Sequence, residues 1–97
     1  MFAIINGGFL FVSKGSKIHI YTMNDNNVLS LGTTLEASNE VLKMEKNVQG
    51  LLLYTTNGVE ILIGNIFEAM QIITLIQGVY GGDAKLNENL QIVSANN

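Results

Sequence analysis

The sequence predicts an all-β protein of antiparallel four-stranded units, with two complete units and half of a third. Short apolar runs rich in β-branched and aromatic residues alternate with turn residues along the chain. Two short breaks that contain glycine, residues 14–17 and 56–58, each separate two such runs, which is the pattern of a hairpin. The stretch 50–65 repeats the pattern of 8–22, so the chain carries an internal repeat.

The first unit is expected to cover residues 2–35. Asn6-Gly7-Gly8 marks its first turn. The stretch 23–27, rich in Asn and Asp, marks its last turn, because these side chains bond the nearby backbone. The four expected strands are residues 2–5, 9–13, 18–21 and 28–31.

The second unit, residues 40–77, repeats this order of strands and turns. A third unit over 83–97 begins with a weak strand at 84–87 and continues with a stronger one at 90–94. The chain stops at Asn97, where a hairpin partner of that last strand would be expected. The four strands expected in the second unit are residues 40–46, 51–55, 59–63 and 70–76.

An α+β domain with a helix over 66–77 is the alternative fold. Asn65 is a suitable helix N-cap, and Gly78 lies just past the expected end. Ser38 could in the same way cap a short helix that runs through Lys46. The β-branched run Ile72-Ile73-Thr74 favours a strand, so the all-β prediction is preferred.

The repeat has a period of roughly 40 residues, which is within the range of four-stranded propeller blades. In this organisation the chain resembles the WD40-like β-propeller family. Residues 18–22 occupy the place where that family often carries its Trp-Asp ending, and residues 61–65 are the second copy. The resemblance lies in period and strand pattern, since the sequence has no tryptophan and no Gly-His pair. It implies two to two-and-a-half blades.

Composition indicates one domain, residues 1–97, with a surface that contacts a protein partner or further copies. Charged residues are only 13% of the chain, too few to coat its surface, whereas apolar residues are 47%. The net charge is -3 and arginine is absent, which argues against nucleic-acid binding. No apolar run is long enough for a membrane span. The apolar start lacks a basic leader, and a cytoplasmic location is slightly favoured.

No catalytic, cofactor or metal site is expected, so the protein is predicted not to be an enzyme. His19 is the single histidine and cysteine is absent, which excludes a triad or a multi-histidine metal site within the chain. Gly78, Gly81 and Gly82 are followed by Asp83 rather than by the lysine and hydroxyl residue of a phosphate loop.

The predicted function is a non-catalytic structural or protein-interaction module that completes a β-propeller or another β-rich assembly with other copies or another chain. One alternative is a small α+β accessory or inhibitory protein that binds a larger target. Another is an oligomeric sugar- or ligand-binding propeller, although seven aromatic residues without tryptophan supply few stacking platforms. The candidate interface residues are two tyrosines near turns, the single histidine, and apolar residues of the expected edge strands: Tyr21, Tyr80, His19, Phe2, Ile4, Leu90 and Ile92.

Overall fold

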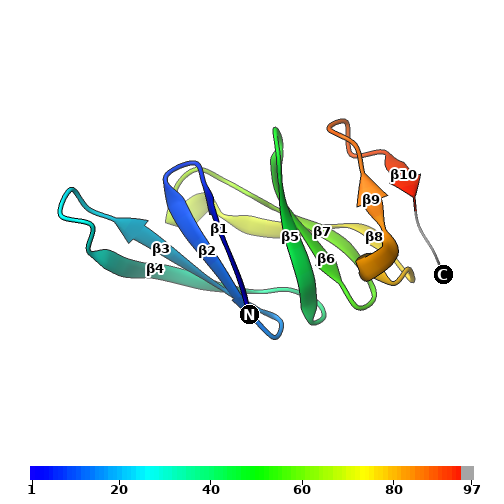
Figure 1. Ribbon diagram of the computed structural model, residues 1–97, viewed down its shortest axis with the longest axis horizontal. Coiled ribbons are helices and arrows are strands. Elements are labelled where there is room, and N and C mark those ends of the chain that lie inside the picture. The colour runs from blue at the N-terminus through cyan, green and yellow to red at the C-terminus, as the bar shows by residue number, and fades with distance from the viewer. Residues whose placement is uncertain (95–97) are drawn as a thin grey trace.

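The chain folds into antiparallel β-sheets that follow one another along the sequence (Figure 1). The computed structural model describes residues 1–94, so residues 95–97 of the expected third unit lie outside the described residues. Strands β1 to β4 form sheet 1 and strands β5 to β8 form sheet 2, each in sequence order, and β9 pairs with β10. The prediction of an all-β chain with antiparallel four-stranded sheets is confirmed.

Sheet 1 is a meander in which each strand pairs with the next one in the sequence. In its β3–β4 turn, Asn24 Oδ1 accepts hydrogen bonds from the backbone N–H groups of Asn26 and Val28. This is the local bonding that makes Asn a turn residue. The strands of sheet 1 are β1 (Phe2–Asn6), β2 (Phe9–Lys14), β3 (Lys17–Met23) and β4 (Leu29–Glu36).

Sheet 2 is a second meander, and its central turn is fixed by Thr55 and Gly58. Thr55 Oγ1 donates to the Gly58 carbonyl oxygen at 3.0 Å and accepts from the Asn57 N–H at 3.2 Å. Gly58 has a φ of 148°, which favours glycine. The strands are β5 (Val41–Asn47), β6 (Gly50–Thr55), β7 (Gly58–Ile63) and β8 (Gln71–Gln77), with the 3-10 helix η1 (Phe67–Ala69) before β8.

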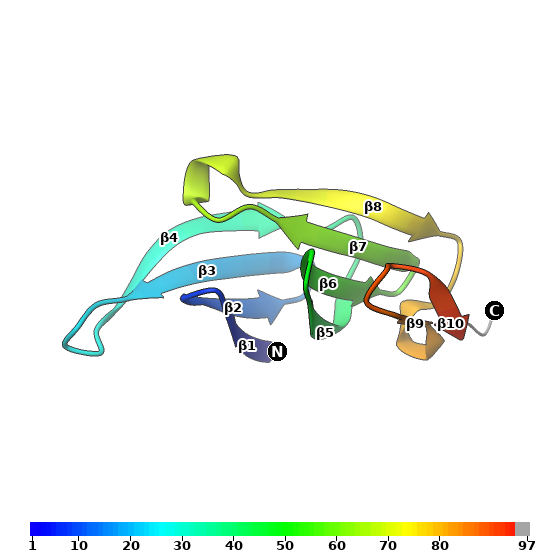
Figure 2. The ribbon, with the colours of Figure 1, turned by 90° about the horizontal axis from the view of Figure 1, so that it is seen from above.

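The end of the described chain is a short strand pair that lies beside sheet 2. The 3-10 helix η2 (Gly81–Asp83) leads from β8 into β9 (Lys85–Leu86), which pairs with β10 (Ile92–Ser94). Figure 2 shows sheet 1, sheet 2 and this pair following one another along the long axis of the molecule. The molecule measures 44 × 25 × 20 Å.

Two separate apolar cores join the three sheets face to face. The first lies between sheets 1 and 2 and includes Phe11, Ile20 and Leu53. The second lies between sheet 2 and the β9–β10 pair and includes Tyr54 and Leu86. Sheet 2 is therefore covered on both faces, and for this reason β6 reads as an unbroken apolar run rather than as an alternating one.

The helix predicted as the alternative over 66–77 is wrong. Only η1 forms there, and the following residues are strand β8. Ile72 and Ile73 pair with Leu62 and Ile61 of β7, so the β-branched side chains pack on a pleated surface. The helix from Ser38 through Lys46 is also wrong, because these residues lead into and form most of β5.

The connection between β7 and β8 reaches back to sheet 1. The ring of Phe67 in η1 packs edge to face on Phe9 of β2, with ring centroids 5.3 Å apart. A side chain at Gly32 in β4 would collide with the Phe67 ring, so glycine leaves the space that this ring fills. Residues 1–94 form two helices, η1 and η2. Neither of them is long enough to cross a membrane.

Candidate functional site

The two four-stranded sheets have equivalent positions 41 residues apart. The β2–β3 hairpin closes with Lys14 opposite Lys17, and the β6–β7 hairpin closes with Thr55 opposite Gly58. The hairpins have the same pairing register, so each residue of β2 and β3 corresponds to one in β6 or β7. The sequence pattern alone suggests a slightly longer offset, 42 residues between Gly8 and Gly50.

Equivalent residues pack in equivalent directions. Phe11 of sheet 1 packs toward sheet 2, and its counterpart Leu52 packs toward the β9–β10 pair. Ile20 and Ile61 form a second such pair. Each sheet thus presents the same face to the sheet that follows it. We call this the following face, and we call the opposite side the preceding face.

None of residues 1–94 covers the preceding face of sheet 1. In sheet 2 the preceding face packs on sheet 1, which leaves Leu53 at 0% and Leu62 at 2% exposure. In sheet 1 the same face is open, with Ile5 at 55% and Leu31 at 57% exposure. We call it the outer face. It consists of two rows across four strands, Ala3, Val12, His19 and Thr34 in one and Ile5, Leu10, Tyr21 and Leu31 in the other.

One polar pair interrupts the apolar outer face. His19 Nδ1 and Thr34 Oγ1 share a hydrogen bond at 3.0 Å between β3 and β4. The equivalent pair in sheet 2 is Glu60 and Thr74, also hydrogen bonded at 3.0 Å. A polar bridge between the third and fourth strands is therefore a shared feature of this face, and in sheet 2 its Glu60 is buried whereas its Thr74 is exposed.

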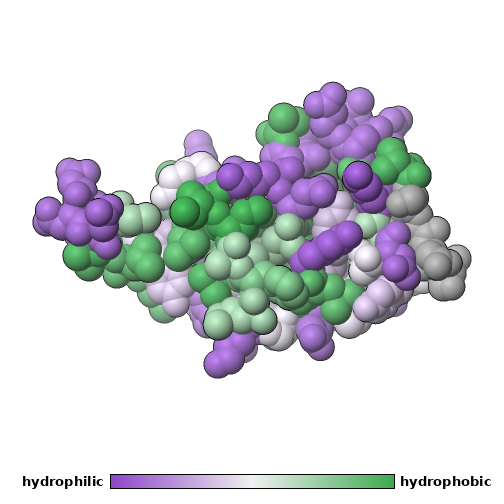
Figure 3. All heavy atoms as spheres, in the orientation of Figure 1, coloured by the Kyte–Doolittle hydropathy of each residue, from purple (hydrophilic) through white to green (hydrophobic). Residues whose placement is uncertain are grey.

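Charged residues border the outer face at one end. Lys14, Lys17 and Glu36 follow one another across β2, β3 and β4. All three are exposed, and Glu36 accepts a hydrogen bond from Ser16 Oγ at 2.8 Å. The apolar area of the outer face thus has a polar rim, which is the composition of protein interfaces. Figure 3 shows apolar residues gathered over the β1–β2 hairpin and again over the far end of β3 and β4.

The structure divides the predicted interface residues among three places. Tyr21 and His19 lie together on the outer face. Phe2 and Ile4 of β1 belong to the opposite side, where Ile4 packs on the first core and Phe2 is 44% exposed. The remaining three lie near the other end of the molecule, namely Tyr80 before η2, the half-buried Leu90 and the exposed Ile92.

The strongest apolar members of the outer face are not among the predicted residues. They are Ile5, Leu10, Val12 and Leu31, which the sequence pattern does not separate from core residues. The signal that finds them is the 41-residue equivalence, because Leu10 and Val12 correspond to Leu51 and Leu53 on the covered face of sheet 2.

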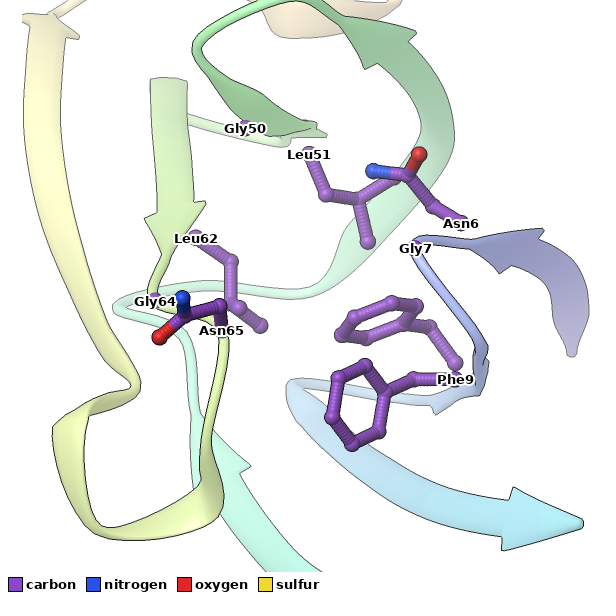
Figure 4. Close-up of a pocket in the computed structure, with 9 residues that line it drawn as sticks. Asn6, Gly7, Phe9, Gly50, Leu51, Leu62, Gly64 and Asn65 are labelled. Atoms are coloured by element: carbon purple, nitrogen blue, oxygen red, sulfur yellow. The ribbon is translucent and has the colours of Figure 1, made fainter.

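A small cavity lies between sheets 1 and 2. Its volume is about 90 Å³, and Phe9, Leu51 and Leu62 line its apolar part. Figure 4 shows the amides of Asn6 and Asn65 on opposite sides of it. Ligand pockets usually measure about 300 to about 1,000 Å³. The cavity therefore has room for water rather than for a sugar or a cofactor.

Acidic side chains do not gather into a metal-binding cluster among residues 1–94. The most buried carboxylate, Glu60, is 3% exposed and accepts hydrogen bonds from Ser38 and Thr74. It holds the β4–β5 linker onto sheet 2. Its contacts are those of a structural residue, and they leave the outer face as the candidate functional surface.

Tyr54 connects sheet 2 to the β9–β10 pair. Its hydroxyl donates to Glu45 Oε1 at 3.2 Å and accepts from the Leu86 N–H at 3.4 Å. The side chain is fully buried. Burial raises the pKa of Tyr54 above its ordinary value, and the nearby Glu45 carboxylate raises it further.

The raised pKa predicts a loss of stability in alkali. Below about pH 10 the folded and unfolded chains both keep the Tyr54 proton. At higher pH the unfolded chain releases it first, so the free energy of unfolding falls until the folded-state pKa is passed. In Tyr54→Phe this fall should be smaller by up to about 1.4 kcal/mol per pH unit. Urea unfolding of both proteins between about pH 8 and about pH 11 measures it. Parallel pH profiles would contradict the prediction.

Comparisons with models of known protein families, with curated proteins and with solved structures found no match. Function is therefore inferred from the outer face and from the order of the sheets.

Proposed function

We propose that this chain is a non-catalytic structural and protein-interaction module that completes a β-propeller, or another assembly of stacked β-sheets, with other copies or another chain. One observation supports this most directly. The preceding face of sheet 2 is buried against sheet 1, whereas the equivalent face of sheet 1 exposes Ile5 and Leu31. The chain itself thus contains an example of how this face is covered.

The exposed area favours association on physical grounds. Burial of apolar surface contributes about 25 cal/mol per Å², and a contiguous exposed patch with a polar rim marks an interaction site. Leu10, Val12 and Tyr21 in the centre of the outer face are only half-buried by their own sheet. A covering sheet would remove them from water, as sheet 1 does for Leu53 and Leu62.

The order of the sheets supports the propeller form of the proposal. Each four-stranded sheet is a meander, and each packs on the next through the same face. Blades of a propeller repeat a four-stranded sheet in this manner around an axis. A ligand-binding propeller is less favoured, because the cavity between the sheets measures only about 90 Å³.

A photo-crosslinking residue at Leu31 tests the proposal in the cells that normally make the protein. Leu31 lies on the outer face and is 57% exposed. The matched control is Val48, which is 84% exposed and lies in the β5–β6 turn, away from this face. We expect one dominant adduct of defined mass from position 31 and none from position 48. Equal adducts from both positions, or none from position 31, would overturn the proposal.

A further inference from the structure

Among residues 1–94 the fold leaves two different faces uncovered, one at each end of the sheet stack. The following faces of sheets 1 and 2 are buried, as shown by Phe11 and Leu52. The preceding faces of sheet 2 and of the β9–β10 pair are also buried, as shown by Leu53 and Leu86. Among residues 1–94 this leaves the outer face of sheet 1 and the following face of the β9–β10 pair.

The β9–β10 pair carries an exposed apolar residue at an irregularity of strand β10. Ile92 is opposite Leu86, which packs toward sheet 2. Lys85 alternates with Leu86, so it points away from sheet 2, and it is exposed. Ser94 pairs with Lys85 across an irregularity in β10, and Val93 at this irregularity is 55% exposed.

We propose that copies of this chain associate head to tail, with the outer face of sheet 1 in one copy packed on the following face of the β9–β10 pair in another. This inference rests on the proposed function and specifies the partner. A second copy is the occupant because it carries the type of face that covers the equivalent side of sheet 2. The contact continues the stacking that already joins sheet 1 to sheet 2 and sheet 2 to the β9–β10 pair.

The two faces differ, so the contact is heterologous. A heterologous contact produces a closed ring when its rotation closes and a filament when it does not. A face-to-face dimer through two outer faces would instead be symmetric, with the same residues on both sides. If one copy is altered on the outer face and another on the β9–β10 pair, a heterologous contact can still form between their intact faces. A symmetric contact through two outer faces cannot form between these copies, because one of the two outer faces is altered.

The test uses two variants of the whole chain. The head variant is altered on the outer face of sheet 1, and the tail variant is altered on the β9–β10 pair. The head variant, Ile5→Lys with Leu31→Lys, places charges on the outer face at positions that are already exposed. The tail variant is Val93→Lys. The control is Val48→Lys with Ile66→Lys, at 84% and 54% exposure and outside both faces. Mass is measured by light scattering and by native mass spectrometry, with the two variants distinguished by isotope labelling.

We expect the unmodified chain and the control to form a defined multimer at micromolar concentration. The head and tail variants should each be monomeric, with association weakened at least about tenfold. Mixed in equal amounts, they should form a dimer with one copy of each, because the intact tail of one fits the intact head of the other. Circular dichroism of each variant checks that the β-fold is retained.

Two results would overturn head-to-tail association. One is an unmodified chain that stays monomeric up to millimolar concentration. The other is a multimer whose head and tail variants form no mixed dimer, which would indicate a symmetric contact or a different surface. Either result leaves the proposed function standing if the crosslinker at Leu31 captures a different protein. A mixed dimer without any adduct at Leu31 in cells would instead support the contact between copies in solution and contradict occupation of the outer face in the cell.

Discussion

Replacement of Glu60 by alanine is expected to lower the free energy of unfolding by about 3 kcal/mol. Glu60 is 3% exposed. Its two oxygens accept from the Ser38 N–H at 2.9 Å, from the Ser38 hydroxyl at 2.7 Å and from the Thr74 hydroxyl at 3.0 Å. Alanine would remove the charged acceptor of all three bonds and would leave a cavity at the buried position of Glu60. Urea unfolding of both proteins at neutral pH measures the loss.

The protein offers a matched exposed control in Glu36. This residue also accepts a hydrogen bond from a serine, Ser16, at 2.8 Å, but the pair is exposed. Glu36→Ala should cost less than about 0.5 kcal/mol, because water replaces the lost bond. Glu60→Gln, which keeps the shape and one acceptor oxygen, should cost roughly half as much as Glu60→Ala. Equal losses for the alanine variants of Glu36 and Glu60 would show that burial does not strengthen the Glu60 contacts.

A double-mutant cycle tests whether Glu60 acts through the linker between the sheets. Ser38 lies between β4 and β5, so its two bonds to Glu60 attach the end of sheet 1 to sheet 2. Ser38→Ala removes the hydroxyl and keeps the N–H. The coupling energy between Ser38→Ala and Glu60→Ala should be about 1 to 2 kcal/mol. A value near zero would mean that Thr74, rather than the linker, accounts for the contribution of Glu60.

The hairpins could be predicted from sequence because their signals are local. The Asn57-Gly58 turn sets its own geometry through Thr55 Oγ1 and a φ that favours glycine, so no distant residue is needed to identify it. The β3–β4 turn is likewise fixed by the Asn24 side chain. The apolar runs on either side of each turn then pair with each other as antiparallel strands.

The choice between helix and strand for 66–77 could not be made from local signals. Asn65 and Gly78 fit the two ends of a helix, and the apolar residues between them fit either structure. Pairing decides it, because β7 offers a free edge and Ile72 and Ile73 complete the sheet there. Neither capping signal is used, because the short turn η1 starts after Ile66 without a side-chain cap and Gly78 follows strand β8 instead of a helix.

The candidate surface was only partly predictable because the face of a strand residue depends on register. Ile4 of an edge strand is opposite Phe11 and points into the first core, whereas its neighbour Ile5 points outward. A shift of one residue would exchange them. His19 and Tyr21 were identified because polar and apolar residues alternate in β3. Leu10 and Val12 were not, because they belong to a face that is buried in one sheet and open in the other.

Replacement of Gly81 by alanine is expected to cost about 3 kcal/mol, the upper end of the range for overpacking of a well-packed core. Gly81 is buried, and η2 brings it directly against the β6–β7 turn. A Cβ there would contact the Thr55 carbonyl oxygen and would lie 2.6 Å from both the Thr55 nitrogen and the Gly58 oxygen. These are backbone atoms of a turn that Thr55 Oγ1 already holds, so they cannot move without breaking its hydrogen bonds.

Gly82→Ala isolates this steric effect. Neither Gly81 nor Gly82 has a positive φ, so the backbone conformation is open to alanine at both positions. The atoms nearest to a Cβ at Gly82 would be those of the Tyr80 ring, the far end of a side chain that is 48% exposed. The net change should be within about 0.5 kcal/mol, because alanine also restricts the unfolded chain. Urea unfolding measures both variants.

Amide hydrogen exchange is a second measurement, because it shows which part of the fold loses stability in Gly81→Ala. Gly81 starts the segment that carries Ala84 and Leu86 into the second core. Displacement of η2 should therefore loosen the β9–β10 pair first, with faster amide exchange at Leu86 and Tyr54 and little change in sheet 1. Because the proposed tail contact needs this pair in place, Gly81→Ala should also weaken self-association, whereas Gly82→Ala should not. Equal stability and equal exchange in the two variants would contradict the close approach of η2 to the β6–β7 turn.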